Sequence, residues 1–209
     1  MLKHLSFEER WNVYTHSLGV ICSSVGIIWI FLFYSPKSLL ATIGLLIYGS
    51  SMIFLFLASS IYHSVKNEKQ TFWQKVDHIG IYFLIAGTYT PVTLTILKES
   101  SGNFILFSVW TIALIGILYE LFFINRFQNF SLIFYLSMGW LVLVDFKNII
   151  LLFPKDVLFF LILGGFFYTF GTLFYRWHKL YLNHVIWHLF VLLGAGSHFV
   201  MISILYSDL

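Results

Sequence analysis

Long apolar segments separated by short clusters of charged residues dominate the chain. Seven segments contain no Lys, Arg, Asp or Glu, and each of them is at least 18 residues long. A helix needs about 20 residues, at about 1.5 Å per residue, to cross a hydrocarbon core that is about 30 Å thick. The pattern therefore predicts an all-α bundle of seven transmembrane helices, which cover residues 13–34, 39–63, 76–97, 103–123, 130–150, 157–176 and 184–206.

The composition agrees with a protein that lies in a bilayer. Hydrophobic residues make up 59% of the 209 residues and charged residues only 10%, whereas a soluble domain carries about 25% charged residues. A soluble helical bundle would still need a polar outer stripe, and the apolar segments do not alternate as the strands of a β-barrel would. The connections are short, so we expect a single membrane domain over residues 1–209 without a soluble domain.

The fifth predicted helix, residues 130–150, has the least distinct pattern. Asp145 and Lys147 lie near its end, and both would be costly inside the hydrocarbon core. An interpretation with six helices, in which this segment is merged or lost, therefore stays open.

The charged loops predict an orientation. Lys and Arg are more frequent in the cytoplasmic loops of membrane proteins. On the side of the N-terminus the predicted topology places Lys3, Arg10, Lys66, Lys69, Lys75, Arg126, Arg176 and Lys179, and on the opposite side Lys37, Lys98, Lys147 and Lys155. This asymmetry predicts a cytoplasmic N-terminus.

Ionisable side chains at the ends of three predicted helices indicate a metal site. His184 and His188 stand four residues apart and share one helix face, a spacing that also arises by chance. His63 ends the second helix, and Asp77 opens the third at the same predicted membrane level. Three imidazoles with an open fourth position are typical of a catalytic zinc site, where Asp77 could hold the metal-bound water or act as a general base. Ser59, one turn from His63, could bind a ligand or only its own helix backbone.

The remaining histidines of the apolar segments have other expected roles. His16 enters the first helix on the same side and could lie behind the ligands, while His78 points about 100° away from its neighbour Asp77. His198 follows His184 by 14 residues, about 21 Å along the helix axis, so a polar packing contact is expected there. Small residues expected to allow close helix packing are Gly164, Gly165 and Gly171.

Four signatures, in this order and at these helix ends, make the chain resemble the hemolysin III branch of the progestin and adipoQ receptor (PAQR) family. The signatures are Glu9-x-x-Asn12-x-x-Thr15-His16, Ser59-x-x-x-His63, Asp77-His78-x-Gly80 continuing to Gly87-Thr88-Tyr89-Thr90-Pro91, and His184-x-x-x-His188 followed by His198.

The resemblance implies a seven-helix fold with a zinc ion near the cytoplasmic face. It implies that His63, His184 and His188 are the zinc ligands and that Asp77 contacts the zinc-bound water. The family's serine one turn before the second-helix histidine corresponds to Ser59. Animal relatives are linked to ceramide hydrolysis, and bacterial relatives carry a cytolysin name.

Two functions of different class follow from these expectations. The first is a zinc-dependent hydrolase of a lipid amide such as a ceramide. The second is a non-enzymatic cytolysin, pore-forming or membrane-homeostasis protein with a structural zinc, in which a pore would need a homo-oligomer. In either case we expect a multi-pass protein of a bacterial plasma (inner) membrane whose partners are membrane lipids. The chain has no basic stripe outside the membrane loops, so no nucleic-acid partner is expected.

Overall fold

The computed structural model describes residues 4–34, 36–66, 68–124 and 128–207, and every regular element within them is a helix. The all-α prediction is therefore confirmed for this part of the chain. The elements in chain order are α1 (Phe7–Phe33), α2 (Leu39–Ser64), α3 (Lys69–Leu94), α4 (Gly102–Phe123), α5 (Gln128–Gly139), the 3-10 helix η1 (Trp140–Asp145), α6 (Phe146–Leu152), α7 (Lys155–Arg176) and α8 (Asn183–Ser207).

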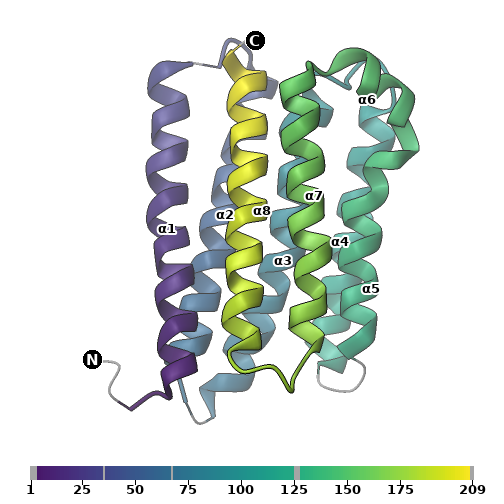
Figure 1. The fold of residues 1–209 in the computed structure, drawn as a ribbon. Coiled ribbons are helices and arrows are strands. Elements are labelled where there is room, and N and C mark those ends of the chain that lie inside the picture. Colours follow the sequence, from purple (N-terminus) through teal and green to yellow (C-terminus); the bar gives the residue numbers. More distant parts are fainter. Residues whose placement is uncertain (1–3, 35, 67, 125–127, 208–209) are drawn as a thin grey trace.

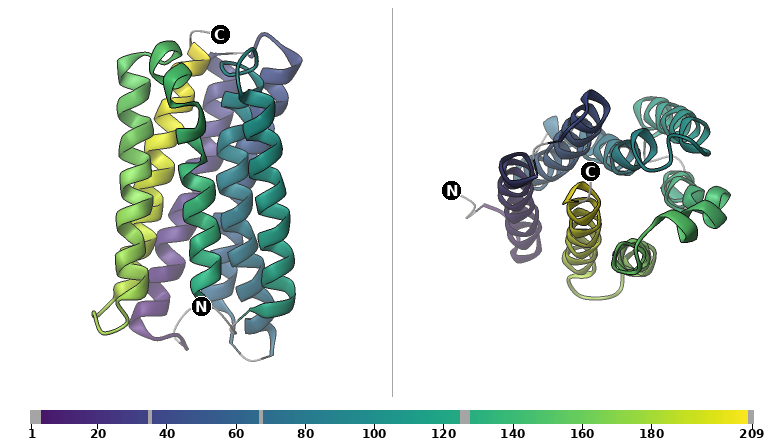
Figure 2. Two further views of the ribbon diagram at one scale, coloured as in Figure 1. Left: turned by 90° about the vertical axis from the view of Figure 1, so that its right-hand side faces the viewer. Right: turned by 90° about the horizontal axis from the view of Figure 1, so that it is seen from above.

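The long helices lie side by side along one direction, and their ends form two opposite faces of the bundle (Figure 1). From α1 to α5 each helix contacts the next one in the chain, α7 contacts both α5 and α8, and α8 contacts α1, so the helices form a ring (Figure 2). One apolar core connects α1, α2, α3, α7 and α8. A second core joins α3, α4 and α5 through Tyr82, Ala86, Val109, Ala113 and Met138.

Six helical segments of the described chain are long and apolar enough to cross a membrane. They are Phe7–Phe33, Leu39–Ser64, Gly102–Phe123, Phe130–Leu152, Lys155–Arg176 and Asn183–Ser207. Large apolar side chains such as Leu32, Phe107 and Leu151 are exposed on the outside of the bundle, where a bilayer would cover them. The protein is thus a multi-pass membrane protein.

Helix α3 is as long as its neighbours but more polar than the six. It packs against both α2 and α4, and its buried residues include Asp77 and Thr90. A helix that faces other helices needs fewer apolar residues than one that faces lipid, which explains why α3 differs in composition.

The segment predicted as the fifth helix is long and apolar enough to cross a membrane in the structure, but its helix type changes half-way along it. α5 ends at Gly139 and continues as η1 and α6. The Tyr89 hydroxyl of α3 donates a hydrogen bond to the Gly139 carbonyl at 2.8 Å and accepts one from the Val142 amide at 2.9 Å. It thereby satisfies backbone groups in the transition region, where unsatisfied groups would be costly in a membrane. The interpretation in which this span is lost is wrong.

Two helices begin earlier than the hydrophobic pattern predicts. α1 begins at Phe7 rather than at residue 13, because Ser6 caps it: the Glu9 amide donates to Ser6 Oγ at 3.2 Å. α3 begins at Lys69 rather than at residue 76. Hydropathy marks the apolar part of a helix, whereas capping and polar turns extend the helix beyond it. As a result, Glu9 and Asn12 are helical residues at one end of the bundle.

The predicted close packing holds at two of the three glycines of α7. A Cβ at Gly164 would lie 2.2 Å from Cδ2 of His198, and one at Gly171 would lie 2.7 Å from Cβ of Phe190, but one at Gly165 would meet open space. The prediction for Gly165 is therefore wrong. His198 also donates from Nε2 to the Leu161 carbonyl at 3.3 Å, which is the packing contact expected from the sequence.

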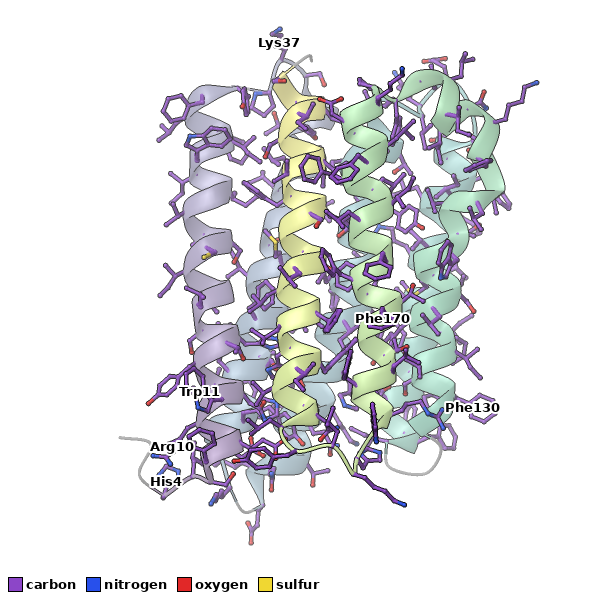
Figure 3. The ribbon with its side chains drawn as sticks, viewed as in Figure 1. His4, Arg10, Trp11, Lys37, Phe130 and Phe170 are labelled. Carbon is purple, nitrogen blue, oxygen red and sulfur yellow. The ribbon has the colours of Figure 1, made fainter. Side chains whose placement is uncertain are left out.

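The loop residues used to predict the orientation lie at two opposite ends of the bundle. Figure 3 shows His4 and Arg10 at the end where the chain begins and Lys37 at the other end. Lys3 and Arg126, which belong to the same comparison, lie outside the described residues.

Candidate metal centre

Three histidines from two helices converge at the end of the bundle that carries the N-terminus. His63 stands one residue before the end of α2, and His184 and His188 stand in the first two turns of α8. One ligand nitrogen from each ring lies within 4.8 Å of those of the other two. The ring centroids are 4.7 to 5.0 Å apart. With small side-chain adjustments, this spacing fits one zinc ion with Zn–N bonds of about 2.0–2.1 Å.

The hydrogen bonds of His63 leave one nitrogen for a metal. Its Nδ1 lies 2.6 Å from Oε2 of Glu9 and 3.4 Å from Nδ2 of Asn12. Its Nε2 is buried and has no hydrogen-bond partner. An unsatisfied buried nitrogen is costly, and a metal ion would remove that cost. The donor set therefore fits the zinc that the sequence predicts.

Asp77 and Ser59 lie beside the three histidines without joining them as ligands. The Asp77 carboxylate is buried on α3, within electrostatic range of His63 and next to Ser59. Ser59 is fully buried, and its hydroxyl makes no hydrogen bond of normal geometry. The metal-binding set contains the three histidines but not Asp77. This arrangement is compatible with a carboxylate that contacts the metal through a water molecule.

Comparison with known proteins identifies the family to which this site belongs. The model of the family described as haemolysin-III related matches residues 5–199. The chain belongs to the haemolysin-III-related family.

Individual relatives agree with this assignment over nearly the whole chain. The Hemolysin-3 homolog of Bacillus subtilis (strain 168) is 39% identical over 194 residues, which are 92% of this chain and 91% of that protein. Hemolysin-3 of Bacillus cereus is 38% identical over 194 residues, covering 92% and 89% of the two chains. The human Monocyte to macrophage differentiation factor is 29% identical over 211 residues, which are 96% of this chain and 85% of that protein. This similarity supports the wider PAQR superfamily that the sequence resemblance indicates.

His16 lies directly against the three-histidine cluster of this haemolysin-III-related protein. Its ring stacks on that of His188 with the centroids 3.6 Å apart and the planes at 9°. Its edge meets Phe56 at a centroid distance of 5.1 Å. The imidazole is buried, and neither nitrogen has a hydrogen-bond partner. His16 thus lies behind a candidate ligand, as the sequence suggested, and is not a member of the metal-binding set.

Glu120 is a buried acidic residue that the sequence analysis missed. It stands three residues before the end of α4, is 1% exposed, and pairs with His78 of α3. Glu120 falls inside the predicted helix 103–123, for which no polar partner was expected. The predicted topology could have indicated this pair. α4 ends on the side where α3 begins, so both side chains lie near the same end of the bundle.

Proposed function

We propose that this haemolysin-III-related protein is a zinc-dependent hydrolase of lipid amides, such as ceramides, in a bacterial plasma membrane. The observation that carries the proposal is the buried, unpartnered Nε2 of His63 together with the convergence of His184 and His188. Asp77 and Ser59 lie beside this cluster and provide the further groups that a hydrolase needs.

The proposal includes an orientation and a seventh span. The excess of Lys and Arg at the N-terminal end supports a cytoplasmic N-terminus. α3 lies alongside the six apolar helices (Figure 1) and is counted as the seventh span. With seven spans the candidate metal centre lies at the cytoplasmic face, near the lipid headgroups.

Each side chain of the site has a role in the proposed reaction. His63, His184 and His188 would hold the zinc, which would supply Lewis-acid polarisation of the amide carbonyl and would acidify a water molecule. Asp77 would accept the proton from the attacking water and later deliver it to the leaving amine. The Ser59 hydroxyl, which has no other partner of normal geometry, would orient the Asp77 carboxylate or the substrate carbonyl.

An apolar hollow deeper in the membrane supports a lipid substrate. It lies between α1, α2 and α8, and its lining includes Gly19, Phe56 and Leu192. Gly19 and Leu192 follow His16 and His188 by about one helical turn. A lipid with its amide at the candidate metal centre could place an acyl chain in this hollow.

Zinc content and lipid hydrolysis, measured on the same purified protein, test the proposal. We expect about one zinc per chain in the wild type, loss of zinc in His184→Ala, and no loss in the control variant His4→Ala, whose residue is exposed before α1. Asp77→Ala should keep the zinc and the fold but lose hydrolysis of a ceramide. Stoichiometric zinc without hydrolysis of any lipid amide or ester in the wild type would refute the enzymatic role.

The name of the Bacillus cereus relative, Hemolysin-3, favours a second candidate function. The zinc would then only fasten α2 to α8, and the protein would act as a cytolysin, as an oligomeric pore or in membrane homeostasis. In this case His63→Ala should lower the thermal stability together with the zinc content. Asp77→Ala should change neither the stability nor the zinc content appreciably.

A further inference from the structure

The first signature of the chain, Glu9-x-x-Asn12-x-x-Thr15-His16, contributes no metal ligand, and the proposed function leaves its purpose open. In the structure all four side chains face the candidate metal centre from α1. Glu9 and Asn12 approach His63, whereas Thr15 and His16 approach the second ligand helix, α8. Glu9, Asn12 and Thr15 contact the Nδ1 atoms of these imidazoles, whereas His16 stacks on the ring face of His188.

The Glu9 carboxylate determines which nitrogen of His63 carries the proton. A neutral imidazole has one N–H and one lone pair. An ionised carboxylate can only accept, so the contact of 2.6 Å between Glu9 Oε2 and His63 Nδ1 places the hydrogen on Nδ1. The lone pair then lies on Nε2, which is the buried nitrogen without a partner. A metal-ligating histidine commonly donates its other N–H to a carboxylate in this way.

The Thr15 hydroxyl does the same for His188. Its Oγ1 lies 2.9 Å and 3.0 Å from the carbonyl oxygens of Trp11 and Asn12, so its single hydrogen is donated to the α1 backbone. Towards His188 Nδ1, at 3.2 Å, it can therefore only accept. The proton of His188 lies on Nδ1, and Nε2 presents a lone pair. The stacked ring of His16 restricts the rotation of the same imidazole.

We infer that α1 is a positioning helix for the metal centre, in which Glu9 and Thr15 set the tautomer and direction of the ligands His63 and His188. The inference rests on the proposed zinc site and concerns residues that would touch neither zinc nor substrate. A plain structural role is the alternative: the Glu9–His63 contact could only fasten α1 to α2 at the membrane surface.

Zinc affinity, measured by competition with a chelator on the purified full chain, distinguishes the two roles. We expect Glu9→Ala to weaken zinc binding by about 10–100-fold, the usual effect of losing such a partner. Glu8→Ala is the matched control, because it removes the same charge from the same helical turn without a contact to His63. Glu9→Gln keeps the size of the side chain and an acceptor oxygen, so it should fold and show an intermediate loss.

Thr15→Val is the second arm of the experiment. Valine keeps the shape and removes the hydroxyl acceptor of His188 Nδ1. The Asn12 carbonyl also lies within reach of His188, so zinc binding should weaken towards the lower end of about 10–100-fold. Thr42→Val is its control, because the Thr42 hydroxyl only donates to the Ser38 carbonyl at the opposite end of α2.

The outcomes separate this inference from the proposed function. If the wild type binds zinc and both variants bind it with unchanged affinity, while only their thermal stability falls, the positioning role is wrong and the proposed zinc site remains. If the wild type binds no zinc, the proposed function and the inference both fail. Lower affinity in both variants, with unchanged affinity in both controls, supports the positioning role.

Discussion

Nδ1 of His78 lies 3.1 Å from Oε2 of Glu120, and this contact joins α3 to α4 within the membrane domain. The second carboxylate oxygen of Glu120 accepts a hydrogen bond from the Ser131 hydroxyl of α5. The Tyr135 hydroxyl, also from α5, donates to the His78 carbonyl at 3.2 Å. Three consecutive helices are therefore connected through one buried carboxylate. This polar cluster adjoins the candidate metal centre, because His78 follows Asp77 in the chain.

Replacement of Glu120 by alanine should destabilise the protein strongly. It leaves His78 and Ser131 without their shared partner in a buried place, and breaking a buried pair from one side costs about 3–5 kcal/mol. The check is the unfolding temperature of the purified protein in detergent. Glu99→Ala is the control, because the Glu99 side chain is 92% exposed and its removal should change stability little. Equal stability of the two variants would contradict the proposed importance of the cluster.

Loss of the Tyr89 hydroxyl should destabilise the junction at which α5 continues as η1. Tyr89→Phe keeps the ring but leaves the Gly139 carbonyl and the Val142 amide without this partner. We expect a loss of about 1–3 kcal/mol in the free energy of unfolding, seen in denaturant unfolding followed by circular dichroism. Tyr181→Phe, at a side chain that is 74% exposed, should stay close to wild type. A wild-type unfolding curve for Tyr89→Phe would show that η1 does not depend on this side chain.

Adjacent glycines of α7 provide a matched test of helix packing. An alanine at Gly164 would place its Cβ 2.2 Å from the His198 ring, so the ring would have to move and lose its contact with the Leu161 carbonyl. Overpacking of this kind costs about 1–3 kcal/mol. Gly165→Ala meets open space and should be neutral or stabilising by up to about 1 kcal/mol. Thermal unfolding of both variants measures the difference, and the reverse order would refute the packing between α7 and α8.

The proposed orientation and the seventh span can be tested by labelling single cysteines in intact cells. Cys22 is first replaced by serine, and a cysteine is then introduced at Glu68 or Lys98, two exposed residues that flank α3. A membrane-impermeant thiol reagent should label Lys98→Cys in intact cells, because the rule of positive cytoplasmic loops places it outside. It should label Glu68→Cys only after permeabilisation. Labelling of both positions in intact cells would show that α3 does not cross the membrane.

Much of the fold follows from the sequence because the apolar segments match the thickness of a bilayer. The seven predicted segments overlap the long helices of the structure, including the span from Phe130 to Leu152. The ends of α1 and α3 differ from the prediction, since polar residues continue a helix beyond its apolar part. The break at Gly139 could not be predicted, because its backbone groups bond to the hydroxyl group of Tyr89, 50 residues earlier.

The convergence of the three histidines was predictable from the sequence, but their surroundings were not. His63, His184 and His188 stand at the ends of α2 and α8, so the topology alone places them at one level. The partners of these histidines were not predictable. Glu9 precedes the first predicted helix, residues 13–34, and nothing in its spacing indicates a contact with His63, 54 residues later.

The sequence alone indicates that this protein lies in a membrane, roughly where its helices run, and which ionisable residues share one end of the bundle. These properties depend on the length of each apolar segment and on the order of the loops. Only the tertiary structure decided which side chains meet: Glu9 with His63, Thr15 with His188, and His78 with Glu120. Such contacts depend on the rotation of each helix about its axis. A helix that is apolar on nearly every face carries little information about that rotation in its sequence.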